Sequence, residues 1–266
     1  MAKSLSLITH ACLLLWTCAV WAEPVHLDYL QERLAPAEEA TVQRALNWIV
    51  EAYERQGLHP NPNLRARIFN HYSDFQTYQH AHRSFHDGSQ PSHSGYYSIG
   101  QRELVTWRHR SLLPLCIHES QHALLRSDFP RPPKWINEGL SECFEGFDFS
   151  QPIPKALPQA PRLRKVKRLL NDDFGRLVVE VASMSEREFN LLANDRGLDS
   201  YTRSWALIYF LWSQPGGEDN VGELIRCLKR GDEAEELLDR LVNGSLEDQL
   251  VEFYRQLPDP PPRKQF

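Results

Sequence analysis

This 266-residue chain lacks several features that are typical of common classes of protein. Basic residues are not in surplus: 30 Lys and Arg stand against 35 Asp and Glu, so the formal net charge is −5. Binding to a phosphate backbone depends on such a surplus, so we expect no nucleic-acid partner. The chain also has no glycine-rich nucleotide-binding motif and no nucleophile elbow, which argues against those two kinds of site.

Long apolar runs are missing, apart from one near the N-terminus. Lys3 precedes an apolar stretch at residues 11–20, and a cleavage site fits between Ala22 and Glu23. This pattern predicts a secretory signal peptide over residues 1–22 and a protein exported across the inner membrane, into the periplasm. An uncleaved anchor is the alternative, but a span needs about 20 apolar residues. After cleavage we expect no stable membrane span.

Cysteine is scarce as well. Five are present, and Cys116, Cys143 and Cys227 remain once the predicted signal peptide is removed. Three cysteines are too few for a disulfide scaffold. Two alternatives remain open for Cys116 and Cys143: a bridge between them, or simple packing of both in the core.

The N-terminal half of the chain alternates between helical and strand patterns. Apolar residues at helical spacing predict a helix from Pro36 to about Gly57. A strand is predicted over 65–70, followed by a helix opened by a capping box of Ser73 and Gln76. Two short strands, 96–99 and 103–107, flank a turn and predict a hairpin.

The rest of the chain has mainly helical patterns, interrupted by a proline-rich linker at 151–161. Helices are predicted over residues 110–126, 135–147, 163–170, 201–212, 221–228 and 234–241, with a last one capped by Ser245. The order of elements indicates an α+β fold in a single domain, 23–257. A small α/β part (23–109) with a short mixed sheet and edge hairpin precedes a helical part (110–257), and 258–266 form a disordered tail.

One motif carries chemistry. His118-Glu119-Ser120-Gln121-His122 is an HExxH sequence inside a helix-forming stretch. Residues four apart on a helix differ by about 40° and one turn of rise, so both imidazoles can face one metal ion. Glu119 lies on the same side, where it can reach a water on that metal. Two surface histidines on an ordinary helix are the alternative.

A carboxylate downstream completes a ligand set. Glu138 lies in Asn137-Glu138-Gly139, at the start of the next helical pattern after a proline-rich turn. A helix, a tight reversal and a second helix bring this carboxylate back toward the two histidines. Two His and one Glu, with water in the fourth position, are typical of catalytic zinc sites. We therefore expect one Zn²⁺ ion bound by His118, His122 and Glu138.

Residues 118–145 resemble the gluzincin metallopeptidases of the peptidase MA-like superfamily, whose signature is HExxH followed by a downstream Glu. Small secreted bacterial members share the Gly-Tyr-Tyr-like hairpin and the Trp-x-Asn-Glu-Gly segment. The resemblance implies a zincin-like helical part and general-base catalysis by Glu119. It also implies that Glu142, four residues after the Glu ligand, hydrogen-bonds a zinc histidine from outside the ligand set.

The resemblance extends more weakly to the helix that begins at Tyr201. In aminopeptidase-N-like enzymes a Tyr at this point stabilises the tetrahedral intermediate, which makes Tyr201 the corresponding candidate; an ordinary helix-start tyrosine is the alternative. The chain lacks the Gly-x-Met-x-Asn segment that binds a free amino terminus. Exopeptidase specificity is therefore not implied.

These features predict a zinc-dependent metallopeptidase that acts on a peptide or protein substrate. In the expected mechanism Glu119 takes a proton from the metal-bound water and passes it to the leaving amine. The strand at 103–107 is expected to pair with the extended substrate. A non-catalytic zinc-containing binding or assembly protein of the cell envelope and an amidase acting on cell-wall peptides are the alternatives. Oligomeric state stays open.

A basic helical face follows the linker, and we expect it to be solvated. Its members are Arg162, Arg164, Lys165, Lys167 and Arg168.

Overall fold

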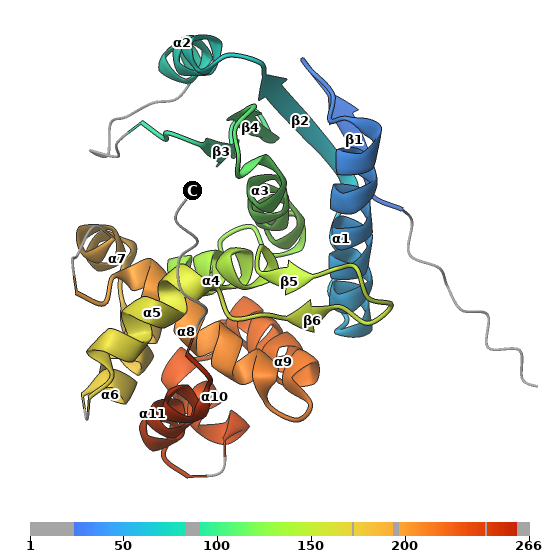
Figure 1. The fold of residues 1–266 in the computed structure, drawn as a ribbon. Helices are drawn as coiled ribbons and strands as arrows, with labels where there is room; N and C mark the ends of the chain where they lie inside the picture. The colour runs from blue at the N-terminus through green and yellow to red at the C-terminus, as the bar shows by residue number, and fades with distance from the viewer. Residues whose placement is uncertain (1–23, 83–90, 172, 194–196, 243, 260–266) are drawn as a thin grey trace, which may run out of the picture.

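A computed structural model describes residues 24–82, 91–171, 173–193, 197–242 and 244–259; the predicted signal peptide and most of the predicted tail lie outside these ranges. The fold is α+β, as the sequence predicts, with a small sheet followed by a helical region (Figure 1). No helix in the described ranges is long and apolar enough to cross a membrane.

The sheet is mixed and has the strand order β1-β2-β4-β3. Strands β1 (His26–Tyr29), β2 (Asn63–Phe69) and β4 (Glu103–Trp107) are parallel, and β3 (Gly95–Ser98) is antiparallel to β4. The predicted hairpin is therefore present, with β3 as the edge strand. Strand β4 is paired on both sides, so it has no free edge to offer a peptide, contrary to the expectation for residues 103–107.

Local sequence explains these elements. Along β2, Leu64, Ala66 and Ile68 are buried while Arg65 is exposed, which is the alternation of a strand with one face on the core. Helix α1 (Pro36–Arg55) joins β1 to β2 and begins with proline, whose fixed φ suits the first helical position. It ends just before Gly57, whose φ of 70° most other residues would adopt only with strain.

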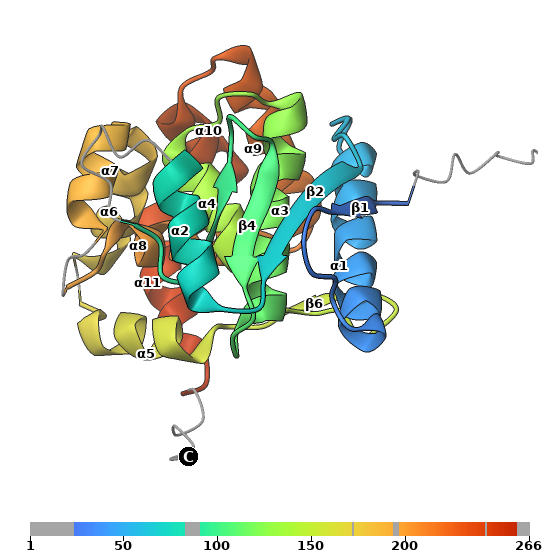
Figure 2. The same cartoon turned by 90° about the horizontal axis from the view of Figure 1, so that it is seen from above.

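Helices cover both faces of the sheet. Helix α2 (Tyr72–His82) lies on one face, against β2 and β4, and α3 (Leu112–Asp128) lies on the other face, against β3 and β4 (Figures 1 and 2). Gly95 permits the close approach of α3 to the edge strand, because a Cβ there would be 2.7 Å from Leu115 Cδ2 and 2.8 Å from the Val105 carbonyl oxygen. Helix α3, which carries the HExxH sequence, therefore packs directly against β3.

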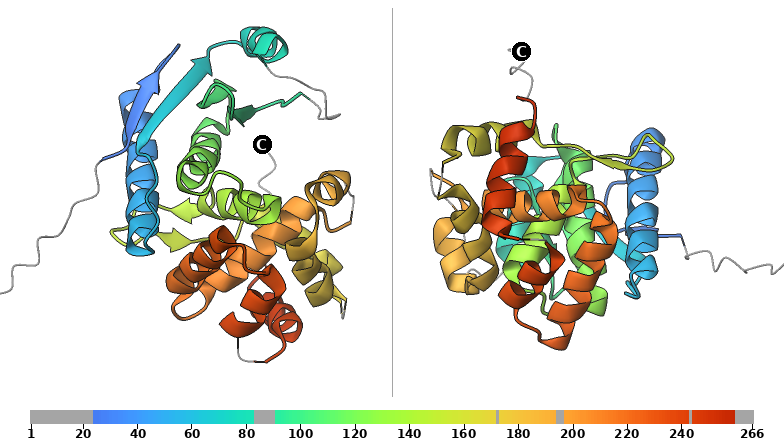
Figure 3. Two further views of the ribbon diagram at one scale, coloured as in Figure 1. Left: turned by 180° about the vertical axis from the view of Figure 1, so that it is seen from behind. Right: turned by 90° about the horizontal axis from the view of Figure 1, so that it is seen from below.

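Helix α4 (Lys134–Phe144) packs against α3 on one side and against α8 on the other. The later helices lie beside α4 and on its far side from the sheet (Figure 3). They are α5 (Ala160–Leu169), α6 (Phe174–Val179), the 3₁₀ turn η1 (Glu180–Ser183), α7 (Glu186–Leu192), α8 (Ser200–Ser213), α9 (Gly217–Arg230), α10 (Ala234–Leu241) and α11 (Leu246–Gln256). A continuous apolar core links α1, the sheet and these helices.

Some expectations differ from the structure in detail. The helix predicted over 135–147 ends at Phe144, because Phe147 enters the short strand β5 (Phe147–Asp148), which pairs with β6 (Lys155–Ala156). Helix α2 begins before Ser73, so the predicted capping box is not its start. Ser245 does cap α11, accepting from the Asp248 N–H.

Short elements with weak patterns were not predicted at all. These are β1, α6, η1, α7 and the β5–β6 pair. The three cysteines of the described chain are buried and free, so Cys116 and Cys143 form no bridge.

Candidate metal centre

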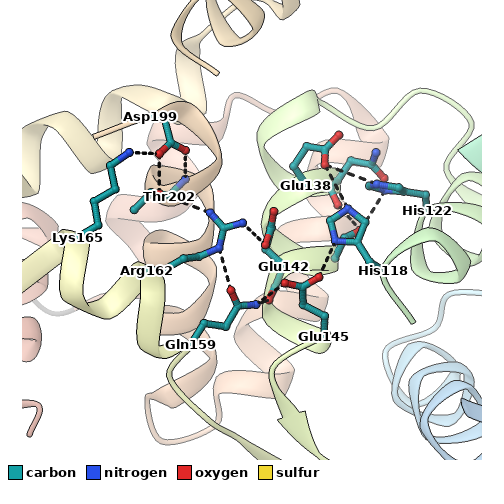
Figure 4. A network of polar contacts seen from close by, with 12 residues as sticks. His118, His122, Glu138, Glu142, Glu145, Gln159, Arg162, Lys165, Asp199 and Thr202 are labelled. Atoms are coloured by element: carbon teal, nitrogen blue, oxygen red, sulfur yellow. Dashed lines mark hydrogen bonds and ion pairs between the residues drawn. The ribbon is translucent and has the colours of Figure 1, made fainter. Parts of the chain in front are cut away.

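Helix α3 carries two histidines one turn apart. His118 and His122 are both largely buried, and their ring centroids are 4.8 Å apart with planes at 89°. A proline-containing turn at residues 129–133 then reverses the chain, and α4 returns along α3 with Glu138 facing both rings (Figure 4). The structure thus brings together the three ligands that the sequence predicts.

The distances between these three groups fit a single metal ion. Glu138 Oε2 is 3.7 Å from His118 Nε2 and 3.5 Å from His122 Nε2. Two atoms bound at about 2.0–2.1 Å to a tetrahedral ion lie about 3.3–3.4 Å apart. Only small movements are therefore needed to place an ion between the three atoms.

The other ring nitrogen of His122 is held by a set of buried uncharged groups, which we call the neutral network: Ser141, Gln121 and Tyr53. Ser141 Oγ is 3.0 Å from His122 Nδ1 and donates its one proton to Gln121 Oε1 or the Asn137 carbonyl. Gln121 Nε2 donates to the Tyr53 hydroxyl at 2.8 Å. When Ser141 donates to either oxygen, its hydroxyl accepts from His122 Nδ1–H, and Nε2 keeps its lone pair for a metal.

The other ring nitrogen of His118 is held by a mainly charged set of groups, which we call the charged network: Glu145, Arg162, Glu142 and the neutral amide of Gln159 (Figure 4). His118 Nδ1 lies 3.2 Å from Glu145 Oε2, and Gln159 Nε2 donates to Glu145 Oε1 at 2.9 Å. A carboxylate only accepts, so Nδ1 carries the hydrogen and Nε2 again faces Glu138. The expected partner of a zinc histidine was Glu142; in the structure Glu145 has that position, and Glu142 forms an ion pair with Arg162.

Charge interactions in this centre are strong. Burial disfavours the charged form of His118, but hydrogen bonds to Glu138 and Glu145 hold its pKa well above the ordinary value. Burial likewise opposes ionisation of Glu138, yet the two imidazoles and Lys134 hold its pKa well below the usual range. Burial raises the pKa of Glu142 to about 7, although Arg162 acts in the opposite direction. The same contacts favour a proton on His118 when no metal is bound.

Lys134 adds a contact that sequence reasoning missed. Its Nζ is 3.5 Å from Glu138 Oε1, the carboxylate oxygen that does not face the histidines. Lys134 and Glu138 are four residues apart on α4, so that spacing is the signal that could have identified the pair. The contact leaves Oε2 as the oxygen available to a metal.

A cleft of about 840 Å³ opens above the three ligands. Glu119 and Tyr201 line it, as do the residues of the edge strand β3. The Glu119 carboxylate makes no hydrogen bond or ion pair with another described residue, and neither does the Tyr201 hydroxyl. Burial and the nearby carboxylates raise the pKa of Tyr201, so its hydroxyl stays protonated and able to donate.

Gly139 explains how Tyr201 reaches this cleft. A Cβ at Gly139 would be 2.7 Å from Ile208 Cγ1 and 2.8 Å from the Ser204 carbonyl oxygen. The absence of a side chain therefore lets α8 pack closely on α4, beside Glu138. The glycine of the Asn-Glu-Gly sequence thus has a packing role next to the candidate ligand.

Comparison with known proteins gives one family match. Residues 116–233 are similar to a family described as "Protein of unknown function (DUF1570)". The matched segment contains the three candidate ligands, Glu119 and Tyr201, but the description assigns no activity. Neither the curated proteins nor the solved structures gave a match.

Proposed function

We propose that this protein is a secreted zinc metallopeptidase of the gluzincin type. The observation that carries the proposal is the convergence of His118 Nε2, His122 Nε2 and Glu138 Oε2 around one point, beside a Glu119 carboxylate that pairs with no other described residue. The Nδ1–H of each histidine has its own acceptor, so both Nε2 atoms are available as ligands. Two imidazoles and one carboxylate are a ligand set that zinc adopts in catalytic sites.

A bound zinc ion would supply Lewis acidity, lowering the pKa of a coordinated water and polarising the scissile carbonyl. Glu119 would accept a proton from the attacking water and deliver it to the leaving amine. Tyr201 would donate a hydrogen bond to the carbonyl oxygen as negative charge develops there.

The edge strand gives the substrate a place to bind. Within the described ranges strand β3 is paired on one side only, with β4, and its residues line the cleft. An extended peptide that added to this edge would be held by its backbone, independently of its side chains. The substrate-binding role first expected for residues 103–107 therefore passes to Gly95–Ser98.

The test is a peptide-library digest by the purified protein, with and without a chelator, together with measurement of bound metal. We expect cuts that the chelator abolishes. Glu119→Gln should keep zinc and lower hydrolysis by about 10²–10⁴, whereas His118→Ala should lose both. Glu235→Gln, at an exposed position on α10, is the matched control and should resemble the wild type.

The outcomes separate the alternatives. Undiminished hydrolysis by Glu119→Gln would remove Glu119 from the mechanism. Zinc without any chelator-sensitive cut would favour a binding or assembly protein. Cuts confined to cell-wall peptides would favour the amidase. A wild-type protein that binds no metal would refute the proposal.

A further inference from the structure

Two carboxylates lie within reach of the same imidazole nitrogen. Oxygen atoms of Glu142 and Glu145 and a ring nitrogen of His118 are all within 4.8 Å of one another. Only Glu145 is hydrogen-bonded to His118, at 3.2 Å. Both side chains come from the last turn and end of α4, so backbone placement alone does not decide which of them holds the ring.

Arg162 is linked to both carboxylates, directly to Glu142 and through Gln159 to Glu145 (Figure 4). One end of its guanidinium forms an ion pair with Glu142. Its Nε donates to Gln159 Oε1 at 2.9 Å, which orients the Gln159 amide so that Nε2 donates to Glu145 Oε1 at 2.9 Å. Arg162 therefore engages Glu142 directly and steadies Glu145 through Gln159.

Arg162 is itself anchored to the start of α8. Its Nη1 is 3.5 Å from Thr202 Oγ1, and Thr202 donates from both its backbone N–H and its hydroxyl to Asp199, at 2.8 Å each. Lys165, one turn further along α5, also pairs with Asp199. The side chain expected to lie on a solvated basic face is thus turned inward and only 20% exposed.

We propose that Arg162 is a positioning residue that makes Glu145, rather than Glu142, the partner of His118 Nδ1. The physical reason is that Glu142 is buried and needs a charged or hydrogen-bonding partner. Without Arg162, the His118 N–H is a donor within reach, and Glu142 would compete for it. The imidazole would then no longer be held with Nε2 toward Glu138.

The test uses Arg162→Met, Arg162→Lys, Glu142→Gln and the combination of Arg162→Met with Glu142→Gln. Arg168→Met, on the exposed face of the same helix, is the control. The first readout is the NMR signal of the His118 Nδ1–H group in the metal-free protein. The second is the zinc dissociation constant, measured by competition with a chelating dye. The second readout depends on the proposed metal site, whereas the first does not.

We expect Arg162→Met to shift the His118 Nδ1–H signal and weaken zinc binding roughly tenfold, as for other outer-sphere partners of metal ligands. Adding Glu142→Gln should return both readouts toward wild type, because an uncharged amide competes poorly with Glu145. Arg168→Met should change neither. Arg162→Lys keeps the charge beside Glu142 but loses the Nε–H, so its effect should be intermediate.

Rescue of Arg162→Met by Glu142→Gln distinguishes a positioning role of Arg162 from a purely structural one. If Arg162 only docks α5, Glu142→Gln will not restore the signal, and the proposal is overturned; an unshifted His118 signal in Arg162→Met overturns it equally. If Arg162→Met does not fold by circular dichroism, Arg162→Lys with and without Glu142→Gln decides. A wild-type protein without zinc affinity refutes the proposed function, while the metal-free His118 signal still tests Arg162.

Discussion

The two histidines of the candidate centre differ in how they are held. The neutral network holds His122 through Ser141, Gln121 and Tyr53, which come from α4, α3 and α1 and pack within the core. The charged network holds His118 through Glu145, whose own position depends on α5. One ligand is therefore oriented by uncharged groups deep in the core and the other by ion pairs at the wall of the cleft.

The difference predicts two kinds of sensitivity. In a buried uncharged network no water replaces a lost partner, so removing one group leaves others unsatisfied in a medium of low dielectric constant. In a charged network partners can be exchanged, and the balance of charges decides which contact forms. We therefore expect changes in the neutral network to affect stability and metal binding together, and changes in the charged network to affect metal binding and its pH dependence.

The largest expected effect comes from Ser141→Ala. This change leaves His122 Nδ1 and Gln121 Oε1 without their shared partner in the core, so the free energy of unfolding should fall by about 1–3 kcal/mol. Zinc affinity should fall by about 10–100-fold, because the imidazole loses the group that orients it. Urea denaturation and competition with a chelating dye measure the two quantities.

Ser200→Ala is the matched control for that prediction. Ser200 is also fully buried, and its hydroxyl donates to the Phe189 carbonyl at 2.8 Å. It should lower stability without changing zinc affinity. Equal loss of zinc affinity in both variants would mean that Ser141 acts through general stability, and the comparison between the two networks would fail.

The sequence predicted those parts of the metal centre that depend on helical geometry alone. The spacing of His118 and His122 and the returning helix with Glu138 are local features, and the structure brings these residues together. The partner of His118 was not predictable in the same way. Glu142 has the spacing that the family resemblance favours, but Arg162, some twenty residues further along the chain, engages it, and Glu145 contacts the ring.

In the fold, too, local features were predictable from the sequence and long-range features were not. Strong periodic patterns gave the main helices and the hairpin, whereas α6, α7 and β1 are short and take their stability from tertiary packing. The pairing order of the sheet was not readable from any one segment. That order makes β3, and not β4, the edge strand beside the cleft.

The second prediction concerns pH and belongs to the charged network. Burial opposes the charge on His118, but Glu138 and Glu145 hold its pKa well above the ordinary value of 6.5. A metal needs the neutral imidazole, so binding must displace this proton. From pH 6.5 up to the raised pKa, zinc affinity should therefore increase by about tenfold per pH unit, with release of about one proton.

Calorimetry of zinc binding in two buffers of different ionisation enthalpy counts that proton. Glu145→Gln removes one of the contacts that raise the pKa of His118, so it should reduce both the proton count and the slope with pH. Ser141→Ala should leave the slope close to that of the wild type. An unchanged proton count in Glu145→Gln would show that Glu145 does not contribute to the charge on His118.

The smallest expected effect is at the far end of the neutral network. Tyr53→Phe removes the acceptor of the Gln121 N–H, which should lower the free energy of unfolding by about 1 kcal/mol. Zinc affinity should fall by less than about threefold, because Ser141 still holds His122. The NMR signal of the His122 Nδ1–H group should nevertheless shift, since Gln121 is freed to move.

Tyr254→Phe provides the control for this last variant. Tyr254 is also fully buried, and its hydroxyl donates to the Ala206 carbonyl of α8 at 2.8 Å, outside both networks. It should lower stability by a similar amount and leave the His122 signal in place. A shift of the His118 signal in Tyr53→Phe would show that the two networks are coupled through the rings, and they would then have to be treated as one.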